Sequence, residues 1–156
     1  LVEILVVLTI IGVIASIIIP SINQARANSR DAKRITDIAS LQLALEVYFN
    51  INNVFPTTPG TWYASEPGAG PFSNNSGNWV PGLAPVFIPN LPQDPVGGLT
   101  NGCNSYLYLS DGDAYKLISH CAMETGYPDP GDDFYDPLRP TWAVMVCSGE
   151  PACSNW

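Results

Sequence analysis

Five acidic side chains lie close together late in the chain, within a stretch rich in proline and glycine. They are Glu124, Asp129, Asp132, Asp133 and Asp136, and they fall within 13 residues. Carboxylate oxygens on a flexible loop suit Ca²⁺, which takes about six to eight oxygen ligands. The spacing does not match that of an EF-hand, and acidic loops are often simply solvated. Calcium binding by Asp129, Asp132, Asp133 and Asp136 is therefore one hypothesis, and a loop without any cofactor is the alternative.

The four cysteines, at positions 103, 121, 147 and 153, all lie in the last third of the chain. Their spacings contain no Cys-x-x-Cys pair, and the chain has a single histidine, so a zinc site is disfavoured. An even number of cysteines is typical of disulfides formed in an oxidising compartment. We therefore expect two disulfides and a C-terminal part that lies outside the cytoplasm.

The pairing of the cysteines follows from a predicted β-hairpin. Residues alternate with period two on both sides of an Asp-Gly turn, which predicts two antiparallel strands. A three-residue loop at 111–113 places Cys103 directly opposite Cys121, at a Cα separation of about 5 Å that a disulfide can span. The second bridge is then Cys147–Cys153, which closes a short loop. A slip of one residue would break this argument, and four cysteines permit two other pairings.

No catalytic constellation is visible in the sequence. His120 follows Ser119, but adjacent residues of a strand point to opposite faces, so the two cannot form the core of a hydrolase triad. We therefore predict that the protein is not an enzyme. Asn74 opens an Asn-Asn-Ser glycosylation sequon, a motif that is common by chance.

The chain opens with an apolar segment that bears one acidic residue, Glu3, at its edge. From Ile4 to Ile19 there is no charge, and a helix of about 20 residues spans roughly 30 Å, the thickness of a bilayer core. A cleavable signal peptide would need a basic flank and a small-residue cleavage site, and neither is visible. We expect residues 1–22 to form a retained hydrophobic helix in a membrane or a filament core.

Three further segments follow this helix and define the predicted fold. Apolar residues at helical spacing predict an amphipathic helix half over 23–52 that packs on a sheet. Residues 53–102 are rich in proline and glycine, which predicts a long variable loop with short strands, anchored by aromatic residues. Residues 103–156 contain the hairpin, a third strand at "TWAVMVC" and the disulfides. The predicted fold class is α+β.

Charge differs strongly between the two parts of the chain. Residues 1–50 carry four acidic and four basic side chains, whereas the rest carries ten acidic and two basic ones, which accounts for the net charge of −8. Nucleic-acid binding needs clustered Lys and Arg, so the acidic domain is not expected to bind nucleic acid. The four bases at 26–34 are expected to form a solvated face, with contact to lipid headgroups or to neighbouring copies as the alternative.

The N-terminal third of the chain resembles the N-terminal helix of type IV pilins and type II secretion pseudopilins. The matching features are Glu3, the apolar run, Gly12, Pro20 and the amphipathic stretch that ends near Phe49. The rest resembles this family only in its layout. Family members usually carry two residues ahead of those that match Leu1-Val2-Glu3, so we expect the processed N-terminus to lie before Leu1.

The resemblance assigns roles to three residues of the helix. In that family the glutamate that matches Glu3 pairs with the N-terminal amine of a neighbouring subunit, which removes the cost of a buried charge and sets the register. Gly12 is expected to allow close approach of helices. Pro20 is expected to mark where the helix bends or melts after assembly. The resemblance also supports the calcium hypothesis, because pseudopilins often hold calcium in a loop of this region.

The resemblance implies a structural subunit that waits in the lipid bilayer and then joins a helical polymer of itself. It also implies an inner-membrane assembly machinery, a prepilin peptidase and an assembly ATPase as partners. The long loop and two disulfides suit an exposed surface, so we predict a major pilin of an extracellular type IV pilus. A type II secretion pseudopilin or minor pilin is the first alternative. A membrane-tethered module that binds carbohydrate through Trp62 and Trp79, without polymerising, is the second.

Overall fold

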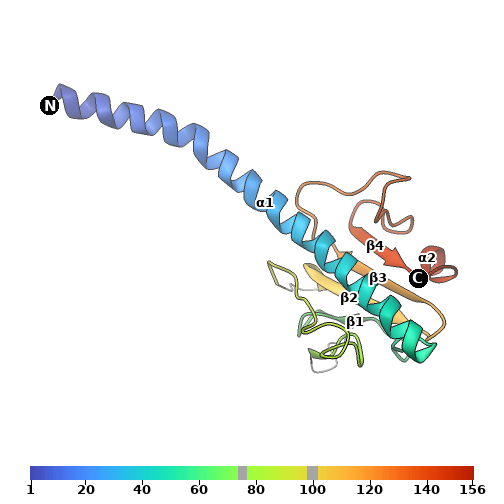
Figure 1. Cartoon of the computed structure of the whole chain (residues 1–156). Helices are drawn as coiled ribbons and strands as arrows, with labels where there is room; N and C mark the ends of the chain where they lie inside the picture. The colour runs from blue at the N-terminus through green and yellow to red at the C-terminus, as the bar shows by residue number, and fades with distance from the viewer. Residues whose placement is uncertain (74–76, 98–101) are drawn as a thin grey trace.

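A computed structural model describes residues 1–73, 77–97 and 102–156. Its elements are α1 (Val2–Asn52), β1 (Tyr63–Ala64), β2 (Ser105–Ser110), β3 (Tyr115–His120), β4 (Ala143–Cys147) and α2 (Ala152–Asn155). The strands form one antiparallel sheet in the order β1-β2-β3-β4, and the C-terminal half of α1 lies across it (Figure 1). This arrangement confirms the predicted α+β class.

Helix α1 is one uninterrupted helix of 51 residues. Pro20 lies inside it without ending it, and Figure 1 shows a gentle curve rather than a break along its N-terminal half. The helix ends at Asn52 and is capped by Asn53, whose backbone has a left-handed conformation (φ 56°) and whose N–H donates to the carbonyl of Phe49. Asparagine tolerates this conformation better than most residues, so the cluster of asparagines explains the predicted stop.

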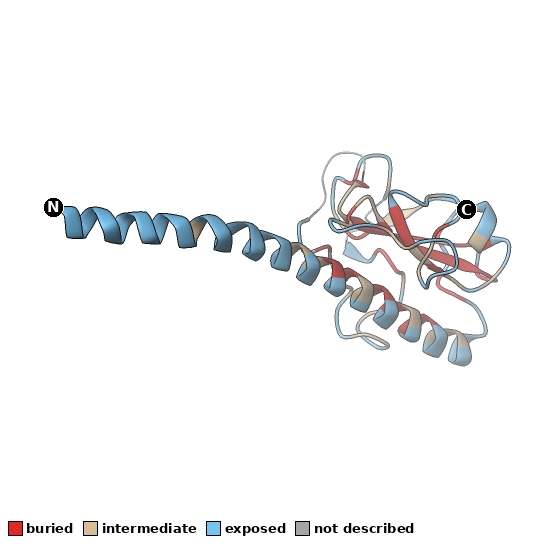
Figure 2. Ribbon diagram, turned by 90° about the horizontal axis from the view of Figure 1, so that it is seen from above, coloured by how far each residue is buried: buried red, intermediate tan, exposed pale blue. Residues whose placement is uncertain are grey.

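The two halves of α1 have different surroundings. The N-terminal half projects from the domain with its side chains exposed, and the first buried residue is Asp31 (Figure 2). From there the buried residues recur every three or four positions, which places them on one face; they are Asp31, Arg34, Ile38, Leu41, Ala44 and Leu45. Each fully buried Ile or Leu contributes roughly 1.5–3 kcal/mol, so this face holds α1 on the sheet.

The long loop between α1 and β2 packs against both faces of the sheet. Trp79 and Leu83 are fully buried in the main core between α1 and the sheet, together with Tyr106 and Leu117. On the opposite face, Trp62 and Phe72 lie half-buried against a smaller cluster that includes Leu107 and Ile118. The expectation that aromatic residues anchor this proline-rich segment is therefore correct.

The β2–β3 hairpin differs by one residue from the predicted register. Ser110 pairs with Tyr115, so the connecting loop comprises residues 111–114 rather than 111–113. The Oδ1 atom of Asp111 accepts hydrogen bonds from the backbone N–H groups of Asp113 and Ala114, at 3.0 and 2.9 Å. This side-chain turn stabilises the longer loop, which the Asp-Gly motif alone did not reveal. The argument that put the first two cysteines directly opposite each other was therefore wrong.

The disulfides nevertheless join the expected pairs. Cys103 is bonded to Cys121 with a Cα separation of 5.0 Å, although both lie just outside the paired strands. Asn104 and Cys121 have positive φ angles of 52° and 40°, so the chain turns at the strand ends and brings the two cysteines together despite the shifted register. The second disulfide, between residues 147 and 153, ties α2 to the end of β4.

Candidate assembly helix and its attachment to the domain

The first 26 residues form a largely apolar rod that projects from the described part of the domain. All of them are exposed except Ala15, which is half-buried. The hydroxyls of Thr9 and Ser16 donate to carbonyls one turn back in the same helix, both at 2.7 Å, so the segment needs no water to satisfy these polar groups. This helix is long and apolar enough to cross a membrane. Because so large an apolar surface is not stable in water, it requires lipid or other helices around it.

Glu3 lies in the first turn of α1 and is exposed. It is the only charged side chain before Arg26, and within the described parts of the chain it makes no ion pair. A carboxylate in the first turn interacts favourably with the helix dipole, but this effect is worth only about 0.3–1 kcal/mol. Once the surrounding apolar surface is covered, Glu3 therefore needs a positive partner from outside the subunit.

Gly12 and Pro20 have no packing role inside the subunit. A Cβ atom added at Gly12 would meet no atom of the described residues within 4 Å, so nothing in that part of the chain requires glycine there. Pro20 lacks the N–H that would continue the helical hydrogen bonding, which weakens α1 locally. Both residues are thus free to serve contacts with other molecules.

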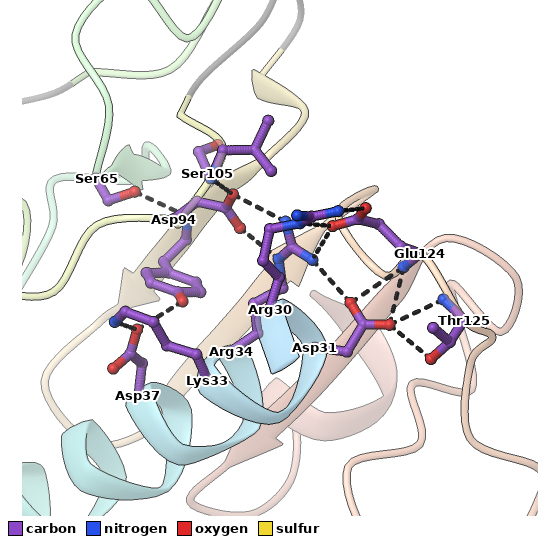
Figure 3. A network of polar contacts seen from close by, with 12 residues as sticks. Arg30, Asp31, Lys33, Arg34, Asp37, Ser65, Asp94, Ser105, Glu124 and Thr125 are labelled. Atoms are coloured by element: carbon purple, nitrogen blue, oxygen red, sulfur yellow. Dashed lines mark hydrogen bonds and ion pairs between the residues drawn. The ribbon is translucent and has the colours of Figure 1, made fainter. Parts of the chain in front are cut away.

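A network of buried charges attaches α1 to the domain (Figure 3). The guanidinium of Arg34 is fully buried and binds both carboxylate oxygens of Asp94, with its Nε at 2.7 Å from Oδ2 and its Nη2 at 3.0 Å from Oδ1. Its Nη1 also donates to Asp31 at 2.7 Å and to Glu124 at 3.0 Å. Burial acts to lower the pKa of Arg34, but the hydrogen bonds to Asp94 and Glu124 outweigh it and raise the pKa above its ordinary value.

Asp31 and Arg30 extend this network to the segment that follows β3. The carboxylate of Asp31 accepts hydrogen bonds from the backbone N–H groups of Glu124 and Thr125 and from the Thr125 hydroxyl, at 2.7–3.1 Å. Arg30 makes a two-pronged contact with the carboxylate of Glu124, with its Nε at 2.6 Å. Hydrogen bonds from Arg30 and Arg34 lower the pKa of Glu124 to about 2. We call Arg30, Asp31, Arg34, Asp94, Glu124 and Thr125 the charge clamp.

The charge clamp was missed at the level of the sequence, where the basic cluster was interpreted as a solvated face. One signal could have revealed part of it. Asp31 and Arg34 continue the helical spacing of the apolar face that includes Ile38 and Leu41, so both fall on the buried side of α1. A charge in such a position requires a buried partner. The partner Asp94 lies 60 residues further along the chain, and no local pattern points to it.

The structure does not bring the four candidate calcium ligands together. Asp129, Asp132 and Asp133 are exposed, and Asp132 accepts a hydrogen bond from the backbone N–H of Asp129. Asp136 is buried and is bound by Lys116 and Arg139. Over the described residues, one group of three ligating side chains lies close enough for a metal ion, namely Cys103, His120 and Cys121, and its two sulfurs form a disulfide. As placed, the four aspartates do not fit a calcium ion.

The remaining candidate residues are placed as follows. The ring of His120 packs edge-on against Phe72 and Trp142, and burial lowers its pKa. Trp79 is 1% exposed, so the hypothesis that it contacts carbohydrate is wrong. Trp62 is half-buried, and the guanidinium of Arg139 lies 5.5 Å from the centre of its ring. Asn74 lies outside the described residues.

An apolar helix half that opens with a glutamate and projects from a small antiparallel sheet defines the class of type IV pilin-like proteins. The chain is 34% identical to type II secretion system core protein G of Vibrio cholerae over 113 residues, which cover 72% of this chain and 70% of that protein. The protein of the same name from Pectobacterium carotovorum is 33% identical over 135 residues, 85% of this chain and 79% of the relative. That of Escherichia coli is 33% identical over 126 residues, 76% and 77% of the two chains.

The chain therefore belongs to the family of type II secretion system core protein G. No family model matches it, and no solved structure matches it.

Proposed function

We propose that this protein is a structural subunit of the periplasmic filament of a type II secretion system, a pseudopilin, rather than the major subunit of an extracellular pilus. The names of its relatives support this choice. The preference for a surface pilus rested on the long loop and the two disulfides. Neither feature distinguishes the two, because disulfides also form in the oxidising periplasm.

The observation that carries the proposal is the exposed apolar half of α1. Apart from the first turn and the carbonyl that faces Pro20, its backbone groups are hydrogen-bonded within the helix, so it can pass from lipid to a bundle of like helices without refolding. In lipid there is little hydrophobic gain from bringing helices together, so close packing and polar contacts must drive assembly. Gly12 offers a site of close approach, and Pro20 a place where α1 can bend.

Glu3 supplies the polar contact in this proposal. Its carboxylate pairs with the N-terminal amine of a neighbouring copy, and a neighbour in the wrong register leaves both charges unpaired in an apolar core. The subunit is first held in the inner membrane by α1 and is then drawn into the filament. The other partners are an inner-membrane assembly machinery, a prepilin peptidase and an assembly ATPase.

The proposal is tested by expressing the protein from its own gene, in a strain with a working secretion system, as Glu3→Ala and as Glu46→Ala. Glu46 is an exposed glutamate on the domain half of the same helix, which makes it a matched control. We expect Glu3→Ala to enter the membrane normally but to yield no filaments in electron micrographs and to block secretion. Glu46→Ala should behave like the wild type.

Three other outcomes would each point elsewhere. Filaments of normal abundance from Glu3→Ala would refute the role of the carboxylate. Long surface filaments at native expression, with secretion unaffected by loss of the gene, would establish the major pilin. A chain that stays dispersed in the membrane whenever it is expressed would favour the membrane-tethered binding module.

A further inference from the structure

Lys116 is a buried cation on an interior strand of the sheet. It lies on β3, and its side chain is fully buried. Its Nζ is 3.1 Å from Oδ1 of Asp136, 3.3 Å from the backbone oxygen of Cys153 and 2.9 Å from that of Trp156. All three partners only accept hydrogen bonds, and an ammonium group has three N–H donors, so the numbers of donors and acceptors match.

The oxygen atoms around Lys116 come from separate parts of the chain. Asp136 belongs to the long connection between β3 and β4, whereas Cys153 and Trp156 belong to α2 and the residue after it. Arg139 reinforces the junction, because its Nη1 donates to the backbone oxygen of Trp156 at 2.7 Å and lies 3.4 Å from Asp136. One ammonium group thus joins β3 to two separate segments of the chain.

A carboxylate oxygen and backbone oxygens are the ligand types that proteins use for hard metal cations such as Ca²⁺. Here the distances of 2.9–3.3 Å are those of N–H···O hydrogen bonds, whereas Ca²⁺ lies about 2.3–2.6 Å from its oxygens. The position that a metal ion would take among these oxygens is therefore filled by the chain itself. Burial lowers the pKa of Lys116, and the neighbouring Asp136 opposes that shift.

We infer that the ammonium of Lys116 is a built-in substitute for a bound metal ion, which holds the β3–β4 connection and the C-terminal segment on the sheet without calcium. Asp136, the buried carboxylate of the acidic stretch, forms an ion pair with this internal cation. The other three aspartates of that stretch are exposed. The disulfide between Cys147 and Cys153 anchors the C-terminal segment, which presents both backbone oxygens to Lys116.

The inference is tested by thermal unfolding of the whole chain in detergent micelles. For the wild type, we expect the same Tm in excess chelator and in millimolar calcium. Lys116→Met should lower Tm by about 10 °C under both conditions, because it removes the buried ammonium that donates to Asp136 and to two backbone oxygens. The control is Lys33→Met, which removes an exposed lysine and should change Tm by less than about 2 °C.

Hydrogen exchange of the same samples localises the effect. In Lys116→Met, amide exchange should accelerate in residues 134–139 and 152–156, and chelator should cause no such change in the wild type. A wild-type Tm that rises with calcium, or a Lys116→Met variant as stable as Lys33→Met, would overturn the inference. If Lys116→Met cannot be purified, the comparison of wild type with and without calcium decides the question alone.

Discussion

The two fully buried cations of the described domain, Arg34 and Lys116, use their side-chain shapes differently. The planar guanidinium of Arg34 binds both oxygens of Asp94 side by side and reaches two further carboxylates. The compact ammonium of Lys116 sits among three single acceptors. Arg34→Lys would lose the paired donors to Asp94, and Lys116→Arg would place a larger planar group where three acceptors surround one nitrogen, so neither exchange is conservative.

The lowered pKa of Glu124 predicts how the charge clamp responds to acid. A folded-state pKa of about 2, below the ordinary value of 4.5, means that Glu124 stabilises the fold fully above about pH 4.5 and loses that contribution as the pH falls towards 2. We expect Glu124→Gln to unfold at lower urea concentration than the wild type at pH 6, and the difference to shrink towards pH 2.

The measurement is urea unfolding followed by tryptophan fluorescence, and Glu46→Gln serves as the control for loss of an exposed glutamate. Comparing variants at each pH cancels the titration of the other carboxylates. A difference between wild type and Glu124→Gln that stays constant from pH 6 to pH 2 would show that the ionised carboxylate of Glu124 does not stabilise the clamp.

At the scale of the elements, the charge clamp decides whether α1 stays docked. Arg34→Met removes the shared partner of Asp31 and Asp94, both of which are buried. Breaking a buried ion pair from one side typically costs about 3–5 kcal/mol, so we expect a loss of that size in the free energy of unfolding. Arg26→Met, at an exposed arginine of the same helix, should change it by less than about 0.5 kcal/mol. Equal stabilities of the two variants would contradict the role of the clamp.

The helices and strands of this fold could largely be predicted from the sequence because they depend on local periodicity. The apolar face of α1 and the strands β2, β3 and β4 follow from spacings of three to four or of two, and the end of α1 follows from the asparagines around position 53. The hairpin register was missed because it depends on how one side chain, Asp111, folds back on the backbone. Alternating residues alone do not report such a turn.

Apart from the local pair of Arg34 and Asp31, the polar contacts described above could not be predicted, because they join residues far apart in the chain. Asp94 meets Arg34 from 60 positions away, and Lys116 meets Asp136 from 20. The acidic stretch was therefore interpreted by its composition, as a group of metal ligands. Its most buried member, Asp136, instead forms an ion pair with Lys116 on β3, which only the tertiary structure could reveal.

At the scale of the whole molecule, the apolar and globular parts are predicted to be separable. Residues 1–24 are exposed apart from the half-buried Ala15, and the charge clamp begins at Arg30. We expect a chain that starts at Ala25 to be a soluble monomer in gel filtration without detergent, with a Tm within a few degrees of that of the whole chain in micelles. Aggregation or loss of the near-ultraviolet circular dichroism would mean that the N-terminal half also supports the domain.

Because α1 is continuous, the clamp also determines where Glu3 points. Thirty-one residues separate Arg34 from Glu3, which is a lever of about 45 Å at 1.5 Å per residue. A swing of only about 5° at the clamp would move Glu3 by about 4 Å, which is the outer limit of an ion pair. The accuracy with which Glu3 can reach a neighbouring subunit thus depends on how rigidly the charge clamp holds α1, far from Glu3 itself. Any bending that Pro20 allows occurs between the clamp and Glu3.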